Sequence, residues 1–465
     1  MIKNFAPFRS AALVTILTTG FCLGQETKEN SADDFKAETP QSWFQKELVN
    51  PATPDFKSSQ VLTKEEVAGM RQKVYKSYKY AARQAGWNKH ILPNQKLVKG
   101  AKPKIEAAIF EQDGKKMPYT VIVHGQRPKG GYPLFFSMHG GGMYSGKEEL
   151  KSPHGWGVNT NEWQTQMKFA VGGVYQPAGV YFIPRMADDN LGRWWHPFNI
   201  KIFKRAIRLT SLFNDVNPNK VYMMGISQGG YGTCHIAPFM ADHLAAAGAM
   251  AGGMMTQTEN LRNLPFRSDI GEGDTAYNRI KLAKALHAKL DENKAKDPKG
   301  FINKLNIQAG KGHGIDYSMT PVWLAKFTRN PYPNKIVWRC FSKKNYYAKN
   351  FYWLSLSDTP KSGEFKVTAV VNKKTNTINV SAEEVIPAKE KGGKASEKAL
   401  QSSDLIVHLN DRIINLDKAV TINVNGKQLF KGKVERKLAN IVNNLSDRGD
   451  INYAFPAQVT IKLKK

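Results

Sequence analysis

Residues 217–232 read NPNKVYMMGISQGGYG. The apolar run at 221–224 predicts a buried strand, and the small residues after Ser227 predict a helix. Between them, the pattern Gly-x-Ser-x-Gly fits a sharp strand-to-helix turn that exposes a serine hydroxyl at the end of a sheet. Such a turn needs glycine or another small residue on both sides, because bulkier side chains would clash there. We therefore expect Ser227 to be a nucleophile.

Two segments after the serine supply the other groups that an activated nucleophile needs. His313 lies between glycines directly after a predicted strand, and the glycines let its imidazole reach a neighbouring side chain. Asp274 follows another predicted strand in a Gly-x-x-Asp pattern, which places a carboxylate at a sheet edge. The chain order Ser227, Asp274, His313 is the order of the α/β-hydrolase fold. We predict that His313 is the base and that Asp274 orients it, with Asp269 and Glu272 as rival acids.

The three consecutive glycines at 140–142 indicate a loop whose backbone N–H groups could donate hydrogen bonds to a tetrahedral oxyanion. It follows His139 at the end of an apolar run that predicts a strand. Glycines expose their backbone N–H groups without obstruction by side chains, as an oxyanion site requires. We expect the donors to be Gly141 or Gly142, together with the backbone N–H of Gln228.

An aromatic and basic stretch follows another predicted strand, where Arg193, Trp194, Trp195 and His196 are consecutive. Aromatic faces stack on sugars or phenolic rings, and arginine can clamp a carboxylate or a sulfate. We therefore assign these four residues to binding of an ester substrate, with an anionic or acylated polysaccharide as its expected class. The alternative is that the tryptophans fill a gap in the core. Because the histidines are not spaced like metal ligands, we expect no metal and no cofactor.

The order of predicted elements indicates the fold class. Strands alternate with helices from about residue 105 to 340, which predicts parallel βαβ units. This alternation and the elbow predict an α/β-hydrolase fold with a mostly parallel sheet, and we place the catalytic domain at 61–345. It includes an N-terminal helix that begins with a capping box at Thr63 and Glu66. Period-two alternation and tight-turn residues then predict a small C-terminal all-β domain at 346–465.

The first 24 residues have the pattern of a bacterial signal peptide. Lys3 and Arg9 precede an apolar stretch of about 14 residues, and small residues follow it. A spanning helix needs roughly 20 apolar residues, so we expect no membrane span after signal cleavage. We predict removal of residues 1–24 and a secreted or periplasmic protein. Residues 25–60 are interpreted as a polar N-terminal segment.

Composition limits the classes of function. The chain has 465 residues, of which 41% are hydrophobic, and a formal net charge of +29. The apolar content excludes a mainly disordered chain, and three cysteines exclude a disulfide framework. No known nucleic-acid-binding motif accompanies the charge, so we expect no nucleic-acid partner and interpret the excess as a preference for anionic surroundings. The sequence leaves open whether Cys234 and Cys340 form a disulfide.

The segment 217–232 resembles the nucleophile elbow of secreted α/β-hydrolase serine esterases. These are the polyhydroxyalkanoate depolymerases and the feruloyl- and acetylxylan-esterases, which are related to prolyl-oligopeptidase-like peptidases. The resemblance spans about residues 105–340, and it implies that Ser227, Asp274 and His313 are the nucleophile, acid and base. It also implies hydrolysis of carboxylic esters on acylated carbohydrate or polyester. A serine peptidase or amidase is the alternative, because the same triad serves both reactions.

Overall fold

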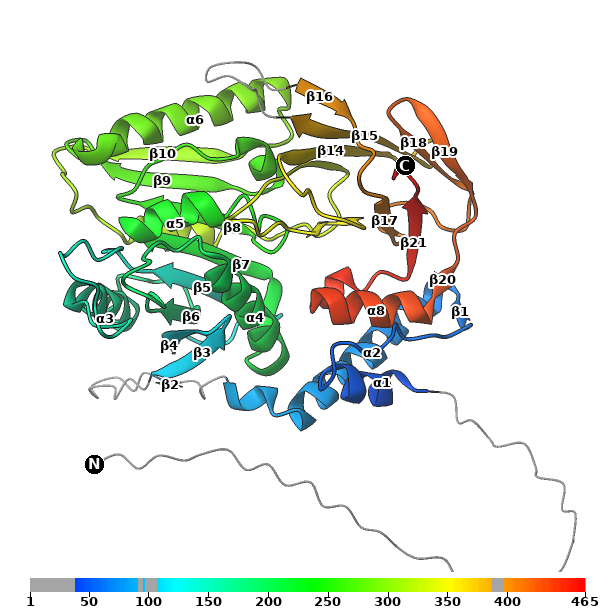
Figure 1. The fold of residues 1–465 in the computed structure, drawn as a ribbon, viewed down its shortest axis with the longest axis horizontal. Coiled ribbons are helices and arrows are strands. Elements are labelled where there is room, and N and C mark those ends of the chain that lie inside the picture. Colours follow the sequence, from blue (N-terminus) through cyan, green and yellow to red (C-terminus); the bar gives the residue numbers. More distant parts are fainter. Residues whose placement is uncertain (1–37, 91–94, 97–106, 387–395, 465) are drawn as a thin grey trace, which may run out of the picture. The chain divides into compact units, whose positions relative to one another are not determined.

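A nine-stranded mixed sheet forms the centre of the α/β part of the chain (Figure 1). Its strands are β2 (Gln95–Lys96), β3 (Ala108–Gln112), β4 (Lys115–His124), β5 (Tyr132–Met138), β6 (Gly179–Pro184), β7 (Val216–Ile226), β8 (Ala246–Met250), β9 (Phe266–Gly271) and β10 (Asn303–Gln308). The spatial order is β10-β9-β8-β7-β5-β6-β4-β2, and β3 pairs with β4. The pairs from β6 to β10 are parallel, whereas β4 is antiparallel to β6. This arrangement is that of the α/β-hydrolase fold and confirms the predicted fold class.

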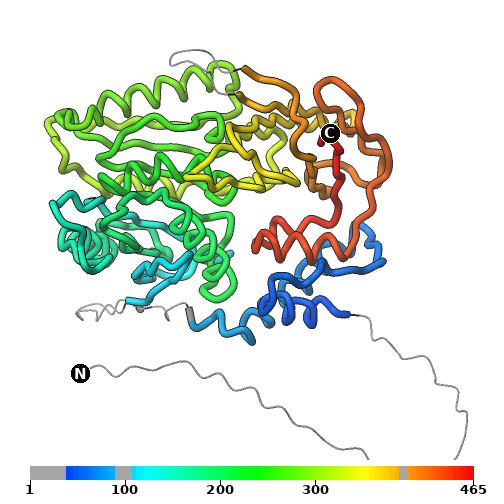
Figure 2. The backbone as a smooth tube through the Cα atoms, viewed as in Figure 1, coloured from blue at the N-terminus to red at the C-terminus, as the bar shows by residue number. Residues whose placement is uncertain are grey.

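The computed structural model describes residues 38–90, 95–96, 107–386 and 396–464. The residues from Thr39 to Lys465 form one compact unit (Figure 2). The predicted signal peptide lies outside the described residues, so the structure does not test it. Among the helices of the described ranges, none is both long and apolar enough to cross a membrane.

Helices cover both faces of the central sheet. One face carries α3 (Gly157–Val171) and α7 (Met319–Leu324), and the other carries α4 (Pro197–Phe213), α5 (Gln228–Ile236) and α6 (Arg279–Lys296). Side chains along β7 alternate between the two faces: Val221 and Met223 pack with α4 and α5, whereas Tyr222 and Met224 pack with α3 and α7. A strand buried on both faces is continuously apolar, which explains the run before the serine.

Two further sheets occupy the C-terminal part. One contains β11 (Lys335–Cys340), β14 (Glu364–Asn372), β15 (Thr377–Ile386), β16 (Ser396–Ala399), β18 (Val420–Val424) and β19 (Lys427–Gly432), and the other contains β12 (Asn350–Phe351), β13 (Leu354–Leu356), β17 (Leu405–Leu409) and β21 (Ala457–Ile461). Asn425 and Gly426 both have positive φ in the turn from β18 to β19, as a tight hairpin requires. Strand β11 lies before the predicted boundary at residue 345, and helix α8 (Leu438–Arg448) accompanies the strands.

The N-terminal elements pack against the end of the chain. They are α1 (Pro40–Glu47), α2 (Lys64–Gln84) and β1 (Val61–Leu62), and β1 pairs with β20 (Arg436–Lys437). Thr63 and Glu66 form the expected capping box of α2. Trp43 and Phe44 are buried in a core shared with α2 and α8. Residues 39–60 of the predicted polar segment therefore include a packed helix. Short 3₁₀ helices lie at Trp87–His90, Thr258–Asn263, Ala276–Asn278 and Ile451–Tyr453.

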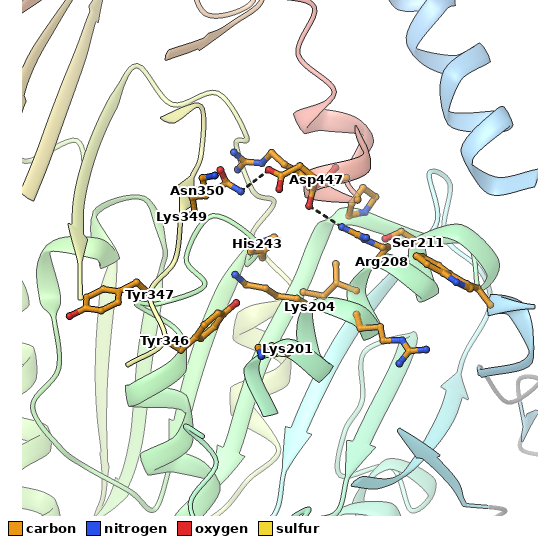
Figure 3. A pocket seen from close by; sticks show the side chains of 17 residues that line it. Lys201, Lys204, Arg208, Ser211, His243, Tyr346, Tyr347, Lys349, Asn350 and Asp447 are labelled. Carbon is orange, nitrogen blue, oxygen red and sulfur yellow. Dashed lines mark hydrogen bonds between the residues drawn. The ribbon is translucent and has the colours of Figure 1, made fainter. Parts of the chain in front are cut away.

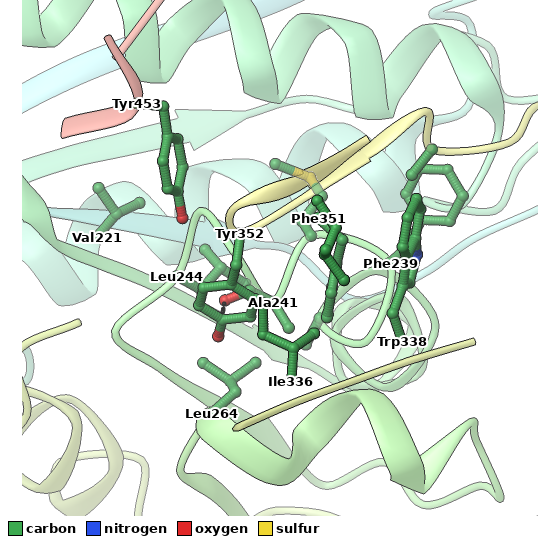
Figure 4. Close-up of a cluster of buried hydrophobic side chains, with 14 of the residues drawn as sticks. Val221, Phe239, Ala241, Leu244, Leu264, Ile336, Trp338, Phe351, Tyr352 and Tyr453 are labelled. Carbon is green, nitrogen blue, oxygen red and sulfur yellow. Dashed lines mark hydrogen bonds between the residues drawn. The ribbon is translucent and has the colours of Figure 1, made fainter. Parts of the chain in front are cut away.

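The C-terminal strands share one continuous apolar core with the α/β part (Figure 4). Trp338 and Tyr352 are buried in the same cluster as Ala241 and Leu244. The Tyr352 hydroxyl donates a hydrogen bond to the Ala241 carbonyl oxygen over 3.1 Å. The two parts are therefore joined by core packing as well as by the chain itself.

A buried ion pair adds to this contact, and its loss is expected to be costly. Arg329 Nη2 lies 2.6 Å from Asp450 Oδ2, and both residues are 5% exposed. Asp450→Ala is expected to lower the free energy of unfolding by about 3–5 kcal/mol, because it leaves a buried guanidinium without its carboxylate. Urea unfolding measures the change. Asp447→Ala removes an exposed carboxylate nearby and should cost less than about 1 kcal/mol; equal losses for the two variants would contradict the prediction.

Two buried histidines, His139 and His408, and two half-buried ones, His235 and His243, predict a loss of stability in mild acid. Burial lowers the pKa of His139, His235 and His408 to about 3 and that of His243 to about 4. Histidine in an unfolded chain titrates near about 6.5, so below that pH the unfolded state binds more protons than the folded state. The stability contributed by these neutral imidazoles is therefore complete above pH ~6.5 and is lost progressively as the pH drops toward about 3. We expect the urea midpoint to change little from pH 7.5 to 6.5 and to decrease from pH 6.5 to 5, and a midpoint that is constant from pH 6.5 to 5 would contradict this account.

Candidate active site

Ser227 lies at the turn from β7 to α5 with φ 53° and ψ −110°, a conformation that is strained for a residue with a side chain. A β-carbon on Gly225 would lie 2.3 Å from the Gly229 carbonyl oxygen. A β-carbon on Gly229 would lie 2.2 Å from the Met138 carbonyl oxygen. Gly225 and Gly229 therefore cannot be replaced by larger residues without a clash with the neighbouring backbone.

The structure brings the three predicted triad residues into one hydrogen-bonded line. Ser227 Oγ lies 3.0 Å from His313 Nε2, and His313 Nδ1 lies 2.8 Å from Asp274 Oδ2. Arg279 Nη1 donates to the other oxygen of Asp274 over 2.8 Å, and Arg279 Nε donates to the Tyr231 hydroxyl over 3.1 Å. Because a carboxylate only accepts, Nδ1 of His313 carries the proton and Nε2 accepts from the serine hydroxyl. The arrangement prepares Ser227 to lose its proton to His313.

The rival acids lie elsewhere. Asp269 accepts hydrogen bonds from Arg267 and from Asn306 Nδ2, the latter over 2.6 Å. Glu272 Oε2 accepts from the backbone N–H of Gly310 over 3.0 Å. Asp269 therefore belongs to a buried polar cluster, whereas Glu272 ties the loop before His313 to the loop that carries Asp274.

The glycine loop after β5 faces the serine. A β-carbon on Gly140 would lie 3.4 Å from Ser227 Cβ. The backbone N–H of Gly142 donates to Asn159 Oδ1 over 2.8 Å, so this N–H is already engaged. This corrects the expectation that Gly142 is an oxyanion donor, and it leaves Gly141 as the candidate in the loop. Gln228 is the first residue of α5, and the first N–H groups of a helix have no partner within it.

A buried polar network that sequence reasoning missed holds this loop. Asn159 accepts from Gly142 N–H and donates to its carbonyl oxygen, and it also donates to Asp189 Oδ1 over 2.7 Å. Asp189 in turn pairs with Arg185, with 2.8 Å between Nη2 and Oδ2. No local pattern marks Asn159, because its partners lie 17 and 30 positions away in the chain.

His139 supports the loop as a neutral imidazole. Nδ1 donates to the Gly140 carbonyl oxygen over 2.6 Å, and Nε2 accepts from the Met186 N–H over 2.9 Å. Burial lowers its pKa to about 3, so the imidazole is neutral at neutral pH, and its two backbone partners fix the tautomer. Trp194 is fully buried and donates from Nε1 to the His139 carbonyl oxygen over 3.1 Å. The assignment of Trp194 to substrate binding is therefore wrong, since the side chain fills the core beneath the loop.

The other residues of that stretch lie beside the elbow helix. Arg193 Nη1 donates to Gln228 Oε1 over 3.0 Å, and its guanidinium lies 5.8 Å from the centre of the Trp195 ring. The Trp195 ring is half-buried, with its centre 3.9 Å from that of His235. His196 is 5% exposed, so it offers little surface to a ligand.

Two lysines from a distant part of the chain join this group. Lys343 Nζ lies 3.0 Å from His235 Nδ1, and Lys344 Nζ lies 3.4 Å from His196 Nε2. We call Arg193, Lys343 and Lys344 the cationic cluster. Burial, followed by the neighbouring Lys343 and Arg193, lowers the pKa of His235 to about 3, so the histidine is neutral. Arg193 and Lys343 therefore contact α5 directly, and Lys344 contacts the neighbouring His196.

The two described cysteines do not pair with each other. Cys234 and Cys340 are both free and buried. Burial raises the pKa of the Cys234 thiol to about 12, and it raises that of Cys340 as well. Both side chains are therefore protonated core groups at neutral pH.

Comparison with known proteins gives only partial likenesses. No family model matches the chain, and no curated protein matches its sequence. A thermostable esterase of known structure aligns with 48% of this chain at 20% identity and a TM-score of 0.34, and the chain spans 63% of that esterase's length. Poly(aspartic acid) hydrolase-1 from Sphingomonas sp. KT-1 aligns with 48% of this chain and 98% of its own length, at 12% identity and a TM-score of 0.36. An esterase from Thermogutta terrifontis aligns with 48% of this chain and 91% of its own length, at 12% identity and a TM-score of 0.32.

Proposed function

We propose that the chain is a carboxylic ester hydrolase that works through an acyl-enzyme on Ser227. The observation that carries the proposal is the hydrogen-bonded line from Ser227 through His313 to Asp274 at a strained strand-to-helix turn. A serine hydroxyl is a weak nucleophile unless a base removes its proton. His313 is placed to act as that base, and Asp274 holds the imidazole in the required tautomer.

The reaction proceeds in two halves. Ser227 Oγ attacks the ester carbonyl carbon while His313 Nε2 takes the hydroxyl proton, and Asp274 stabilises the imidazolium that forms. The backbone N–H groups of Gly141 and Gln228 stabilise the oxyanion. As the bond to the alcohol breaks, His313 gives the proton to the leaving oxygen. Water, deprotonated by the same imidazole, then hydrolyses the acyl-enzyme.

The proposed substrate class is acylated carbohydrate with an anionic group close to the ester. The half-buried Trp195 ring beside the elbow helix supports stacking on a sugar, and the cationic cluster supports a carboxylate or sulfate on it. The predicted export signal at residues 1–24 would bring the enzyme to such a polymer.

An ester and an amide of the same acyl group test the reaction class. We expect purified protein to hydrolyse an N-protected alanyl p-nitrophenyl ester and to leave the corresponding p-nitroanilide intact. Cleavage of the anilide with kcat/KM within about a hundredfold of the ester value would instead favour the peptidase alternative. Acetylated oligosaccharides with and without uronate residues then test the substrate class, with the acidic series expected to have the lower KM.

A further inference from the structure

A cavity of about 520 Å³ lies apart from the serine, between α4, the segment 343–350 and the C-terminal end of α8 (Figure 3). Lys201, Lys204 and Arg208 line it from α4, and Tyr346 and Lys349 line it from the facing segment. We call it the cationic cavity. Its volume is in the range of small-molecule sites. It is far larger than the volume of about 30 Å³ that one molecule occupies in liquid water.

The charges of this cavity are only partly compensated. Lys201 Nζ pairs with Asp113 at 2.7 Å, and Asp447 accepts a hydrogen bond from Asn350 Nδ2 over 2.8 Å. Lys204 and Lys349 form no ion pair within the described part of the chain. Because the free cations come from two opposite walls, the cavity fits a ligand that carries more than one anionic group, or one anionic group on a body wide enough to reach both walls.

Aromatic rings accompany the cations. The Lys204 ammonium lies 5.8 Å from the centre of the Tyr346 ring and 5.6 Å from that of Phe239, and Lys204 extends from α4 toward Tyr346 (Figure 3). The Lys201 ammonium lies 5.6 Å from the same Tyr346 ring. Trp87 also lines the cavity. Phe239 is buried, but the rings of Tyr346 and Trp87 line the cavity, and aromatic rings next to cations suit a sugar ring that bears a carboxylate or a sulfate.

A continuous set of contacts connects the cavity with the elbow helix. Arg193 contacts Gln228, the residue after the nucleophile, and Lys343 contacts His235 on the same helix. Lys343 and Tyr346 exchange two backbone hydrogen bonds, of 2.8 Å and 3.0 Å. The segment from Lys343 to Lys349 thus carries positive charge from the C-terminal end of α5 to the cavity. Because the cations of the cavity and of this segment are spread out rather than gathered at one point, they suit an oligosaccharide with several anionic groups better than a compact anion.

We propose that the cationic cavity is a second binding site that takes an acidic oligosaccharide. The site holds a carboxylate- or sulfate-bearing sugar unit between Lys204 and Lys349, with its face against Tyr346. Binding in this cavity requires no ester cleavage. The proposal therefore does not depend on the proposed esterase function. The lining includes Pro218 near the start of β7, whereas Ser227 follows the end of that strand, so the two sites lie toward opposite edges of the sheet.

Isothermal titration of the full chain with three hexasaccharides tests the proposal. The probes are hexagalacturonate, a sulfated galactan hexasaccharide of equal length and neutral xylohexaose, all at about 50 mM salt. We expect at least one acidic probe to bind and xylohexaose not to bind. The stronger of the two acidic probes identifies the anionic group. Binding of xylohexaose as tight as that of both acidic probes, or no binding of either acidic probe, would overturn the proposal.

Charge-matched variants locate the binding. Lys204→Gln combined with Lys349→Gln is expected to raise the Kd of the acidic probe at least tenfold. Lys284→Gln combined with Lys431→Gln removes two lysines outside the cavity and should change the Kd less than twofold. Equal weakening by both double variants would show that only overall charge matters. Melting curves report folding, and the single variant Lys349→Glu, at an exposed position, replaces the first double variant if that one does not fold.

A nucleotide combines a flat ring with negative charge as well, and it provides the competing outcome. ATP that binds more tightly than both acidic hexasaccharides, and that loses affinity in the Lys204 and Lys349 double variant, would overturn the sugar assignment. Because every readout is binding, a negative result here leaves the ester assays unaffected, and failure of the ester assays leaves this site testable.

Discussion

Ser227→Ala is expected to lower kcat/KM for p-nitrophenyl acetate by about 10⁴- to 10⁶-fold, because it removes the oxygen that forms the acyl-enzyme in the proposed mechanism. The hydroxyl contributes nothing to the packing of the core that the variant would disturb, since alanine keeps the β-carbon. Release of p-nitrophenol by purified protein measures the effect, and melting curves establish that the variant is folded.

Ser362→Ala is the matched control for this variant. Ser362 is exposed in the loop before β14, and its removal should leave kcat/KM within twofold. Activity of the Ser227 variant that stays within a few-fold of the parent protein would refute the assignment of the nucleophile.

Asp274→Asn is expected to lower kcat by about 10⁴-fold while leaving the fold intact. Arg279 Nη1 donates to one side of this group, so the amide oxygen faces Arg279 and the NH₂ group faces His313 Nδ1, which favours the imidazole tautomer that cannot take the serine proton. It also leaves Arg279 without its carboxylate, so a small loss of stability should accompany the loss of rate.

Glu272→Gln tests the rival acid in the same loop. Glu272 is exposed and contacts the Gly310 N–H rather than the imidazole, so we expect kcat within about threefold of the parent value. A larger loss for Glu272→Gln than for Asp274→Asn would contradict the proposed roles.

The features that sequence reasoning predicted are those whose geometry is encoded locally. The glycines on both sides of Ser227 are required because a β-carbon at either position would clash with a nearby backbone carbonyl oxygen. The run from Val221 to Met224 is apolar because both faces of β7 are covered. The capping box at Thr63 involves residues three positions apart. In each case the sequence pattern and the structural cause lie within a few residues of one another.

The features that were missed depend on residues that are far apart in the chain. The N–H of Gly142 is engaged by Asn159, and Trp194 is buried while its neighbour Trp195 is not. Both facts follow from how helices α3 and α4 pack on the sheet, which no local pattern specifies. Lys343 reaches His235 across 108 positions, and β11 joins a sheet that is otherwise built from later residues. These contacts depend on how distant segments pack together, which a local sequence pattern does not specify.

Stoichiometric labelling with a p-nitrophenyl alkylphosphonate tests the central claim most directly. This reagent resembles the tetrahedral intermediate and reacts with a serine that an adjacent base has activated. We predict release of one equivalent of p-nitrophenol per chain, complete loss of esterase activity, and a phosphonyl group on the peptide that contains Ser227. Loss of activity with the label on another residue, or full esterase activity in protein that remains unlabelled, would contradict the account.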